Sequence, residues 1–297
     1  MIRVSVPATS ANVGAGFDAV GLALGLYNTA EFFPAEKLEI TSSDGTAVPA
    51  DETNLIYVSA KYLYDKAGEP IPGMKIVQTN PIPMARGLGS SSACILAGLL
   101  GANRMLGEPF GTAELLEFAT EIEGHPDNVA PALLGGLVSS VCDGGKVYAA
   151  KHALDQSLAF AAVIPDYPLL TSAARAALPK NVSHAQAVFN LSRAALLGEA
   201  FCNGRHDLLP VVTQDRLHQQ YRMALMPGAE QAFAAARRLG AKAVYVSGAG
   251  STMMAVVEQA DAYAFCRQLK AELAESEACR SFTLKRLSAD NRGAFVE

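Results

Sequence analysis

Hydrophobic and polar positions alternate along short stretches of the chain, and this pattern predicts its β-strands. Residues 2–6 alternate with a period of two, as strands with one buried face do, whereas residues 158–164 form the continuous apolar run of a buried strand. Residues 21–26 and 29–33 have the pattern of a hairpin-like pair. The remaining predicted strands are residues 74–78, 137–141, 147–150, 243–246, 252–257 and 281–287.

Apolar residues that recur every three or four positions predict the helices. Leu55, Val58, Tyr62 and Leu63 lie on one side of a helix over residues 54–67. The other predicted helices are residues 93–106, residues 112–123 with Thr112 as N-cap, a short helix from His125-Pro126 to Gly135, and residues 183–201, 229–239 and 261–273. Because strands and helices do not alternate regularly, the pattern predicts an α+β fold of packed layers.

Length and composition indicate a globular protein of two domains. With 297 residues, half of them hydrophobic, the chain can bury a substantial core. We expect an N-terminal domain of residues 1–155 and a C-terminal domain of residues 156–297, because a second group of strands and helices begins near residue 158. The net charge of −5 lacks the basic excess of nucleic-acid-binding proteins, so no nucleic-acid partner is expected.

Cysteine use and hydropathy predict a cytoplasmic protein. The five cysteines are dispersed, without a Cys-x-x-Cys pair, which indicates reduced thiols rather than disulfides or a zinc site. No apolar run reaches the roughly 18 residues of a membrane span, so no membrane partner is expected. The sequence leaves the oligomeric state open, with a homodimer among the alternatives.

A glycine- and serine-rich segment precedes the helix at residues 93–106 and predicts a phosphate-binding loop. The segment comprises Pro83, Met84, Ala85, Arg86, Gly87, Leu88, Gly89, Ser90, Ser91 and Ser92. Unpaired N–H groups and the dipole make a helix N-terminus an anion site, and glycines let a phosphate approach the backbone. The serines can cap the helix, bind phosphate oxygens or ligate Mg²⁺. No lysine follows the last glycine, so this is not a P-loop, and a serine-capped turn is the alternative.

Two further polar clusters have both a structural and a functional interpretation. Residues 7–18 form a small-residue loop between strands, in which Asn12 and Asp18 suit either a polar substrate or an Asx turn. An acidic stripe on the helix at 112–123 is typical of a solvated face, and one member is a metal ligand if that face meets the glycine loop. The stripe consists of Glu114, Glu117 and Glu121.

The remaining candidate site residues are isolated basic residues and a third glycine turn. His125 precedes a helix, where a histidine is typically a cap or core residue. Arg175 and Arg222 carry no functional signal of their own and are typical of surface arginines. Residues 248–251 place glycines between two apolar strands, which predicts either a hairpin loop or a turn whose N–H groups enter a site.

Three glycine-rich segments in this order resemble the superfamily of small-molecule kinases named for galacto-, homoserine, mevalonate and phosphomevalonate kinases (GHMP kinases). They span residues 7–18, 83–93 and 246–251. Within the superfamily the chain resembles the homoserine kinases over nearly its full length, through further motifs at residues 7–12, 124–131, 171–175, 221–222 and 226–228. The resemblance implies an N-terminal domain like domain 2 of ribosomal protein S5 and a ferredoxin-like C-terminal domain, without RNA binding.

Transferred residue by residue, the resemblance implies where ATP, Mg²⁺ and an amino-acid substrate bind. The ATP phosphates are expected on residues 83–92, with Ser91 as the hydroxyl near Mg²⁺ and Glu117 as the carboxylate on the metal. Asn54 is expected to face the nucleotide base. The residues expected around the substrate are Asn12, Asp18, His125, Arg175 and Arg222, with Thr171 close to its hydroxyl.

One position separates the chain from the mevalonate-type members, which have an aspartate as base. Counting back from Gly135-Gly136 places Asn128 there, as in homoserine kinases, and Asp127 on the same helix points about 100° away. We therefore expect Asn128, Arg175 and Thr171 to act by positioning and electrostatics. The implied reaction is phosphoryl transfer from ATP to the side-chain hydroxyl of L-homoserine, giving O-phospho-L-homoserine for threonine synthesis. The alternatives are a kinase of another small alcohol and a silent nucleotide-binding sensor.

Overall fold

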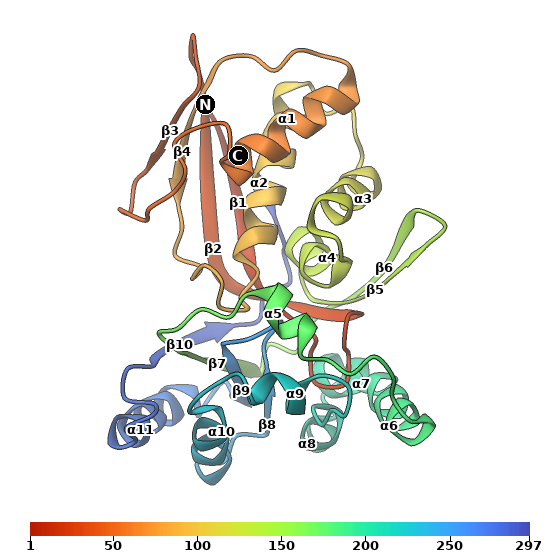
Figure 1. The fold of residues 1–297 in the computed structure, drawn as a ribbon, viewed down its shortest axis with the longest axis vertical. Coiled ribbons are helices and arrows are strands. Elements are labelled where there is room, and N and C mark those ends of the chain that lie inside the picture. The colour runs from red at the N-terminus through yellow and green to blue at the C-terminus, as the bar shows by residue number, and fades with distance from the viewer.

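The computed structural model describes residues 1–297, which fold into two layered domains (Figure 1). The strands of the first sheet are β1 (Ile2–Ala11), β2 (Val20–Pro34), β3 (Glu39–Ser42), β4 (Met74–Thr79), β5 (Leu137–Asp143), β6 (Lys146–His152) and β11 (Phe295–Val296). They run in the order β11-β1-β2-β4-β3, with β5 paired to β2 and to β6. All neighbours are antiparallel except β3 and β4.

Four helices cover one side of this sheet (Figure 1). They are α1 (Leu55–Ala67), α2 (Ser90–Met105), α3 (Thr112–Glu123) and α4 (Pro126–Leu134). The helix α2 is apolar on most of its circumference because β1 and β2 contact one side of it and α1, α3 and α4 contact the others. Its N-terminus therefore has a fixed position at the end of β1 that faces the second domain.

The second domain is a four-stranded antiparallel sheet with two long helices on one face. Its strands are β7 (Leu158–Ile164), β8 (Ala243–Val246), β9 (Met253–Glu258) and β10 (Thr283–Ser288), and the helices are α10 (Ala229–Arg238) and α11 (Ala262–Glu275). The strand order β10-β7-β9-β8 corresponds to 4-1-3-2 in chain order, which is the ferredoxin-like arrangement. This confirms the predicted α+β architecture.

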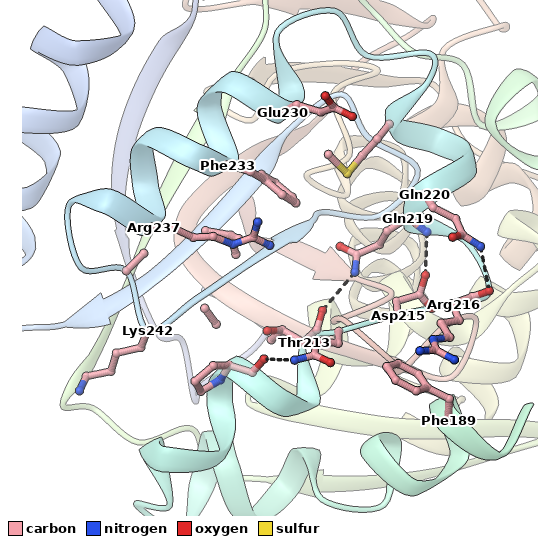
Figure 2. A pocket seen from close by; sticks show the side chains of 16 residues that line it. Phe189, Thr213, Asp215, Arg216, Gln219, Gln220, Glu230, Phe233, Arg237 and Lys242 are labelled. Atoms are coloured by element: carbon pink, nitrogen blue, oxygen red, sulfur yellow. Dashed lines mark hydrogen bonds between the residues drawn. The ribbon is translucent and has the colours of Figure 1, made fainter. Parts of the chain in front are cut away.

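Short helices fill the connection between β7 and α10. They are α5 (Thr171–Ala176), α6 (His184–Ala194), α7 (Leu197–Cys202), a 3₁₀ turn at His206–Leu208, α8 (Leu209–Val212) and α9 (Gln219–Met223). Figure 1 shows α5 at the level where the two domains meet and α9 within the C-terminal domain. Between α9, α10 and β8 the domain has a cavity of about 740 Å³ that is open to solvent (Figure 2). No helix is long and apolar enough to cross a membrane.

One hydrophobic core joins the two domains. Phe160, Ala162 and Ile164 of β7 belong to a cluster of 50 buried residues that also contains the core of the N-terminal domain. The alternate residues of β7, such as Ala161 and Val163, belong to a cluster of 20 that packs under α10 and α11. The second sheet is therefore buried on both faces, which is why β7 has a continuous apolar sequence.

The structure corrects several predicted boundaries. Residues 21–26 and 29–33 are parts of the single strand β2 rather than a hairpin. The predicted helix over 183–201 is broken into α6 and α7. The largest difference concerns the domains, because β11 pairs with β1 in the register Val4↔Val296 and so belongs to the N-terminal sheet. The division into 1–155 and 156–297 therefore misplaces the segment that carries β11.

Candidate active site

The three glycine-rich segments meet where the two domains join. The N–H of Thr9 in β1 donates to the carbonyl of Leu88 at 3.1 Å, and the N–H of Thr252 donates to Arg86 at 3.0 Å. The third turn also contacts β1 directly, through the N–H of Gly248 and the carbonyl of Ala11 at 2.9 Å. Segments distant in sequence thus form one continuous backbone network around a small pocket.

Gly87 and Gly89 are required by packing within this network. Both have positive φ, 76° and 71°. A Cβ on Gly87 would lie 2.2 Å from the carbonyl oxygen of Ser247, and one on Gly89 would lie 2.0 Å from Oγ1 of Thr9. The expected reason for these glycines was close approach of a phosphate, but their first role is to let the loop fit against β1 and the third turn.

The N-terminus of α2 opens into the pocket without a side-chain cap. Gly89 is its N-cap, in the left-handed conformation, and no side chain accepts from the first turn. The N–H groups of that turn therefore have no partner within the helix. Ser91 and Ser92 donate their hydroxyls instead to the carboxylate of Glu123, at 2.8 and 3.1 Å. An uncapped helix start beside a hydroxyl and a carboxylate suits a phosphate with a divalent cation.

Glu123, and not Glu117, is the carboxylate at the serines. Glu123 lines the pocket at the C-terminal end of α3, whereas Glu117 does not line it. Six residues on an α-helix correspond to about 9 Å along the axis and a rotation of roughly 120°, so the two side chains point to different places. Glu123, and not Glu117, therefore lies beside Ser91, where the resemblance implied a carboxylate.

Two residues expected at the nucleotide have structural partners instead. The side chain of Asn54 is 2% exposed and caps α1, accepting from the N–H of Ile56 at 3.0 Å and donating to Pro49. It is too buried to face a nucleotide base. The guanidinium of Arg86 donates to the carbonyls of Pro165 and Asp166, at 3.0 and 2.7 Å, and so ties the glycine loop to the second domain.

The start of α4 contributes an imidazole, a carboxylate and an amide to the pocket. His125 Nδ1 lies 2.6 Å from Oδ1 of Asp127, and this hydrogen bond raises the pKa of His125 against the effect of burial. Asn128 accepts from the Thr9 hydroxyl at 2.9 Å, which fixes the orientation of its amide. Asp127, which helix geometry places about 100° from Asn128, is only 1% exposed and is also among the residues that line the pocket.

Asp18 and Arg175 form a bidentate ion pair at the edge of the pocket. The two guanidinium nitrogens lie 2.8 and 3.2 Å from the two carboxylate oxygens. Asn12 accepts from the backbone N–H of Asp18 at 2.8 Å, and both residues have positive φ, 56° and 57°. This hydrogen bond spans six residues and not the two of an Asx turn, so the side chain of Asn12 closes the whole loop. The loop presents the carboxylate of Asp18 to Arg175, as a structural role requires.

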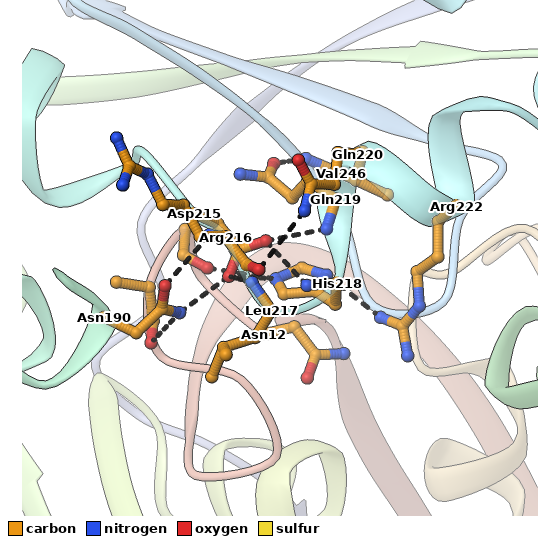
Figure 3. Close-up of polar contacts among 12 residues, drawn as sticks. Asn12, Asn190, Asp215, Arg216, Leu217, His218, Gln219, Gln220, Arg222 and Val246 are labelled. Atoms are coloured by element: carbon orange, nitrogen blue, oxygen red, sulfur yellow. Dashed lines mark hydrogen bonds and ion pairs between the residues drawn. The ribbon is translucent and has the colours of Figure 1, made fainter. Parts of the chain in front are cut away.

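Arg222 is the largest fully buried side chain and points into the pocket from α9 (Figure 3). It is 1% exposed, and its Nη1 donates to the carbonyl of Gly248 at 2.8 Å and to Nδ1 of His218 at 3.2 Å. Its Nε is buried without any partner. Burial and then the charge of Arg175 lower the pKa of Arg222 to about 10, so it remains charged near neutrality. A buried cation with an unused donor requires an anion.

His218 holds this arginine in place. It is completely buried, its ring stacks on Phe17 at 5.1 Å, and Nε2 lies 3.0 Å from the carbonyl of Gly14. Because Nε2 must donate to that carbonyl, Nδ1 is free to accept from Arg222. Burial lowers the pKa of His218 to about 4, which keeps the ring neutral beside the guanidinium. No feature of the sequence pointed to this residue.

The pocket thus collects most, but not all, of the predicted residues. Those that line it are Asn12, Arg86, Gly87, Gly89, Ser90, Ser91, His125, Asn128, Thr171, Arg175 and Arg222. Those that do not line it are Asp18, Asn54, Pro83, Leu88, Ser92 and Glu117. Leu88 is a core residue, and Asp18 is held at the edge by Arg175. Glu123 and Asp127 were not predicted as site residues, whereas residues 248–250, which also line the pocket, belong to the turn for which the sequence left a hairpin loop and a site role open.

Comparison with known proteins agrees with this arrangement. A family model described as the GHMP kinases N terminal domain matches residues 54–136, and one described as GHMP kinases C terminal matches residues 188–275. Homoserine kinases of Clostridium beijerinckii and Caldicellulosiruptor saccharolyticus are 45% and 44% identical over 100% of this chain, and over 98% and 96% of their own lengths. The crystal structure of homoserine kinase from Cytophaga hutchinsonii has a TM-score of 0.86 at 28% identity, covering 100% of this chain and 97% of that one.

The two family models thus match parts of both domains, and the relatives match the whole chain. The chain belongs to the GHMP kinase family, and within that family it groups with the homoserine kinases.

Proposed function

We propose that this protein transfers the γ-phosphoryl group of ATP to the side-chain hydroxyl of L-homoserine. The observation that carries the proposal is one pocket in which an uncapped helix start faces a buried arginine with an unused donor. The first is a site for the phosphates of ATP, and the second is a site for a carboxylate. The names of the relatives at 44–45% identity support the same reaction.

The acceptor site matches the charges of an α-amino acid. Arg222 and Arg175 offer cations for the carboxylate, and Asp18 offers an anion for the ammonium. Asp18 and Arg175 neutralise one another in the structure. When a zwitterionic amino acid binds, its ammonium can pair with Asp18 and its carboxylate with Arg175, in place of the ion pair between the two residues. Thr171 and Asn128 would then lie beside the side-chain hydroxyl. The roles of Thr171 and Asn128 are part of this proposal.

Mg²⁺ fits the donors at the helix start. Ser91 Oγ and the carboxylate of Glu123 are hard oxygen donors that lie together, and no cluster of three acidic, histidine or cysteine side chains exists to bind a softer metal. Such a site leaves positions for phosphate oxygens and water, which Mg²⁺ usually retains. When bound, Mg²⁺ neutralises charge on the transferred phosphoryl group.

The residues of the chain act mainly by positioning. The helix N-terminus holds the phosphates, and the buried arginine fixes the acceptor so that its hydroxyl faces them. Asp127 is engaged by His125, and Asn128 is an amide, so neither side chain is a free carboxylate that could act as base. The loose transition state of phosphoryl transfer requires alignment and charge neutralisation more than a strong base.

ATP consumption measured with homoserine, mevalonate and a hexose tests the proposal. We expect ATP to be consumed with homoserine but not with mevalonate or the hexose. Arg222→Lys should raise the KM for homoserine about tenfold or more with little effect on the KM for ATP, because lysine cannot reproduce a fixed guanidinium fork. Turnover of mevalonate or the sugar in preference to homoserine would contradict the substrate, and ATP binding without any turnover would favour a sensor.

A further inference from the structure

A second cavity lies in the C-terminal domain, separate from the active site. It has a volume of about 740 Å³ and lies between α9, α10, β8 and the turn at residues 213–216 (Figure 2). None of its lining residues lines the active-site pocket. Its size is within the range of cavities that bind small molecules. The reaction proposed above does not use it.

Two exposed arginines that line this cavity each lie against an aromatic ring and have no carboxylate partner. The guanidinium of Arg216 lies 4.0 Å from the ring centre of Phe189, and that of Arg237 lies 5.5 Å from the ring centre of Phe233. Neither guanidinium takes part in an ion pair or donates a side-chain hydrogen bond. A guanidinium placed against an aromatic ring keeps its N–H groups free at the edge, where they can bind oxyanions.

The acidic residues of the cavity do not neutralise these arginines. The carboxylate of Asp215 accepts from three backbone N–H groups, those of Leu217, His218 and Gln219, and from Asn190. Glu230 lies seven residues before Arg237 on α10, which is about 10 Å along the helix. A third cation, Lys242, already forms an ion pair with Glu258 at 2.9 Å. The cavity thus has two unpaired cations in a protein whose net charge is −5.

We propose that this cavity is a second ligand site, which binds a small molecule with at least two negative charges from carboxylate or phosphate groups. Arg216 and Arg237 bind the charged groups from two sides, one from the turn before α9 and one from α10. Two preoriented guanidinium groups select oxyanions over neutral molecules because each can donate two parallel hydrogen bonds.

The wall of the cavity also supports the acceptor site, so the two sites can communicate. Gln219 donates to the carbonyl of Thr213 at 3.1 Å and accepts from the N–H of Val246 at 2.7 Å, joining the turn to β8 (Figure 3). The same short segment continues from Arg216 through the buried Asp215 network to Arg222. A ligand that moves Arg216 would therefore change the position of Arg222, and with it the affinity for the acceptor.

Isothermal titration calorimetry tests the site without relying on turnover. Citrate and inorganic phosphate are titrated separately into the full chain, with a non-hydrolysable ATP analogue, Mg²⁺ and homoserine present to fill the active site. We expect citrate, phosphate or both to bind, which distinguishes the carboxylate from the phosphate class. Arg216→Gln and Arg237→Gln should each weaken this binding about tenfold or more, because each removes a charged hydrogen-bond donor.

Arg238→Gln is the matched control. Arg238 is adjacent to Arg237 on α10 but pairs with Glu272 and does not line the cavity, so its loss should leave binding unchanged. Glu230→Gln should leave binding equal or tighter, since it removes a negative charge. No binding of either anion at millimolar concentration would overturn the proposal, as would equal weakening by Arg237→Gln and Arg238→Gln. Because heat is measured and not catalysis, the result stands whether or not homoserine is the acceptor.

Discussion

At the scale of single residues, burying Arg222 lowers the stability of the fold but provides a cation for the substrate. Burial and then the charge of Arg175 lower its pKa, and its Nε lacks a hydrogen-bond acceptor within the protein. An unsatisfied buried donor destabilises a fold by about 1–3 kcal/mol. The arginine is tolerated because His218 and the carbonyl of Gly248 accept from Nη1.

Glu123→Gln should abolish most activity while leaving the fold intact. The amide keeps hydrogen-bonding capacity toward Ser91 and Ser92 but lacks the charge needed to hold Mg²⁺. We expect kcat to fall at least a hundredfold, measured in an ATP-consumption assay beside a thermal unfolding curve. Glu117→Gln, on the same helix but outside the pocket, is the control and should be nearly silent. A larger loss of kcat in Glu117→Gln than in Glu123→Gln would instead identify Glu117 as the metal ligand.

Two substitutions of His218 separate positioning from stability. An asparagine side-chain oxygen can take the place of Nδ1, whereas the glutamine amide nitrogen can take the place of Nε2. His218→Asn should therefore keep the acceptor for Arg222, and His218→Gln should lose it while keeping the donor to Gly14. We expect the KM for homoserine to rise about tenfold more in the glutamine variant, with similar kcat and similar loss of stability in both.

The difference in KM between the two variants is the decisive measurement. If His218 had only a structural role, both substitutions would lower stability and would leave the two KM values alike. Equal KM values for His218→Asn and His218→Gln would show that the hydrogen bond to Arg222 does not position the guanidinium. Thermal unfolding of both variants provides the comparison.

At the scale of elements, the glycine loop depends on a close fit to its neighbours. Gly87→Ala should destabilise the protein by about 2–4 kcal/mol, because its φ is 76° and the new Cβ would meet the carbonyl of Ser247 at 2.2 Å. Gly145→Ala is the matched control, since its φ is 80° but nothing lies within 4 Å, and it should cost about 1 kcal/mol. Urea unfolding measures both, and equal losses would show that strain, not packing, governs the loop.

Elements with strong local signals were predictable from the sequence, and those held by distant contacts were not. β7 and β8 were predicted to the residue because they are continuous apolar runs bounded by polar residues. β2 was mistaken for two strands because Tyr27 and Asn28 interrupt the apolar pattern, although Asn28 accepts from the N–H of Ile82 across the fold. α9 escaped prediction because its start is held by the buried carboxylate of Asp215.

The site was predictable in its parts but not in its arrangement. The sequence identified an acidic helix and a serine loop, yet which glutamate meets the serines depends on how α3 packs against α2. In the same way, nothing local indicates that Asn54 is buried under Gln78, which donates to it at 3.0 Å. Family resemblance supplied the acceptor residues, because Arg175 and Arg222 come together only in the folded chain.

At the scale of the whole molecule, the segment that carries β11 completes the N-terminal domain. The backbones of Arg3 and Glu297 exchange two hydrogen bonds, at 3.0 and 2.8 Å, and the N–H of Ala294 donates to Ala132 at 2.8 Å. Removing residues 291–297 should lower the free energy of unfolding by roughly 3–5 kcal/mol through these lost bonds and the exposed edge of β1. Glu297→Ala, which keeps the backbone, should have no effect. An unchanged melting temperature after truncation would mean that the pairing contributes nothing.

The pairing of β11 with β1 has a consequence for synthesis of the chain on the ribosome. Residues 295–296 are made after every other part of the fold, but their partners at residues 4–5 are among the first to emerge. Until residues 295–296 have left the ribosome, β1 therefore has an open strand edge, which is a template for pairing between nascent chains. The edge of β1 is covered only after the C-terminal domain has been synthesised, although β1 belongs to the N-terminal sheet.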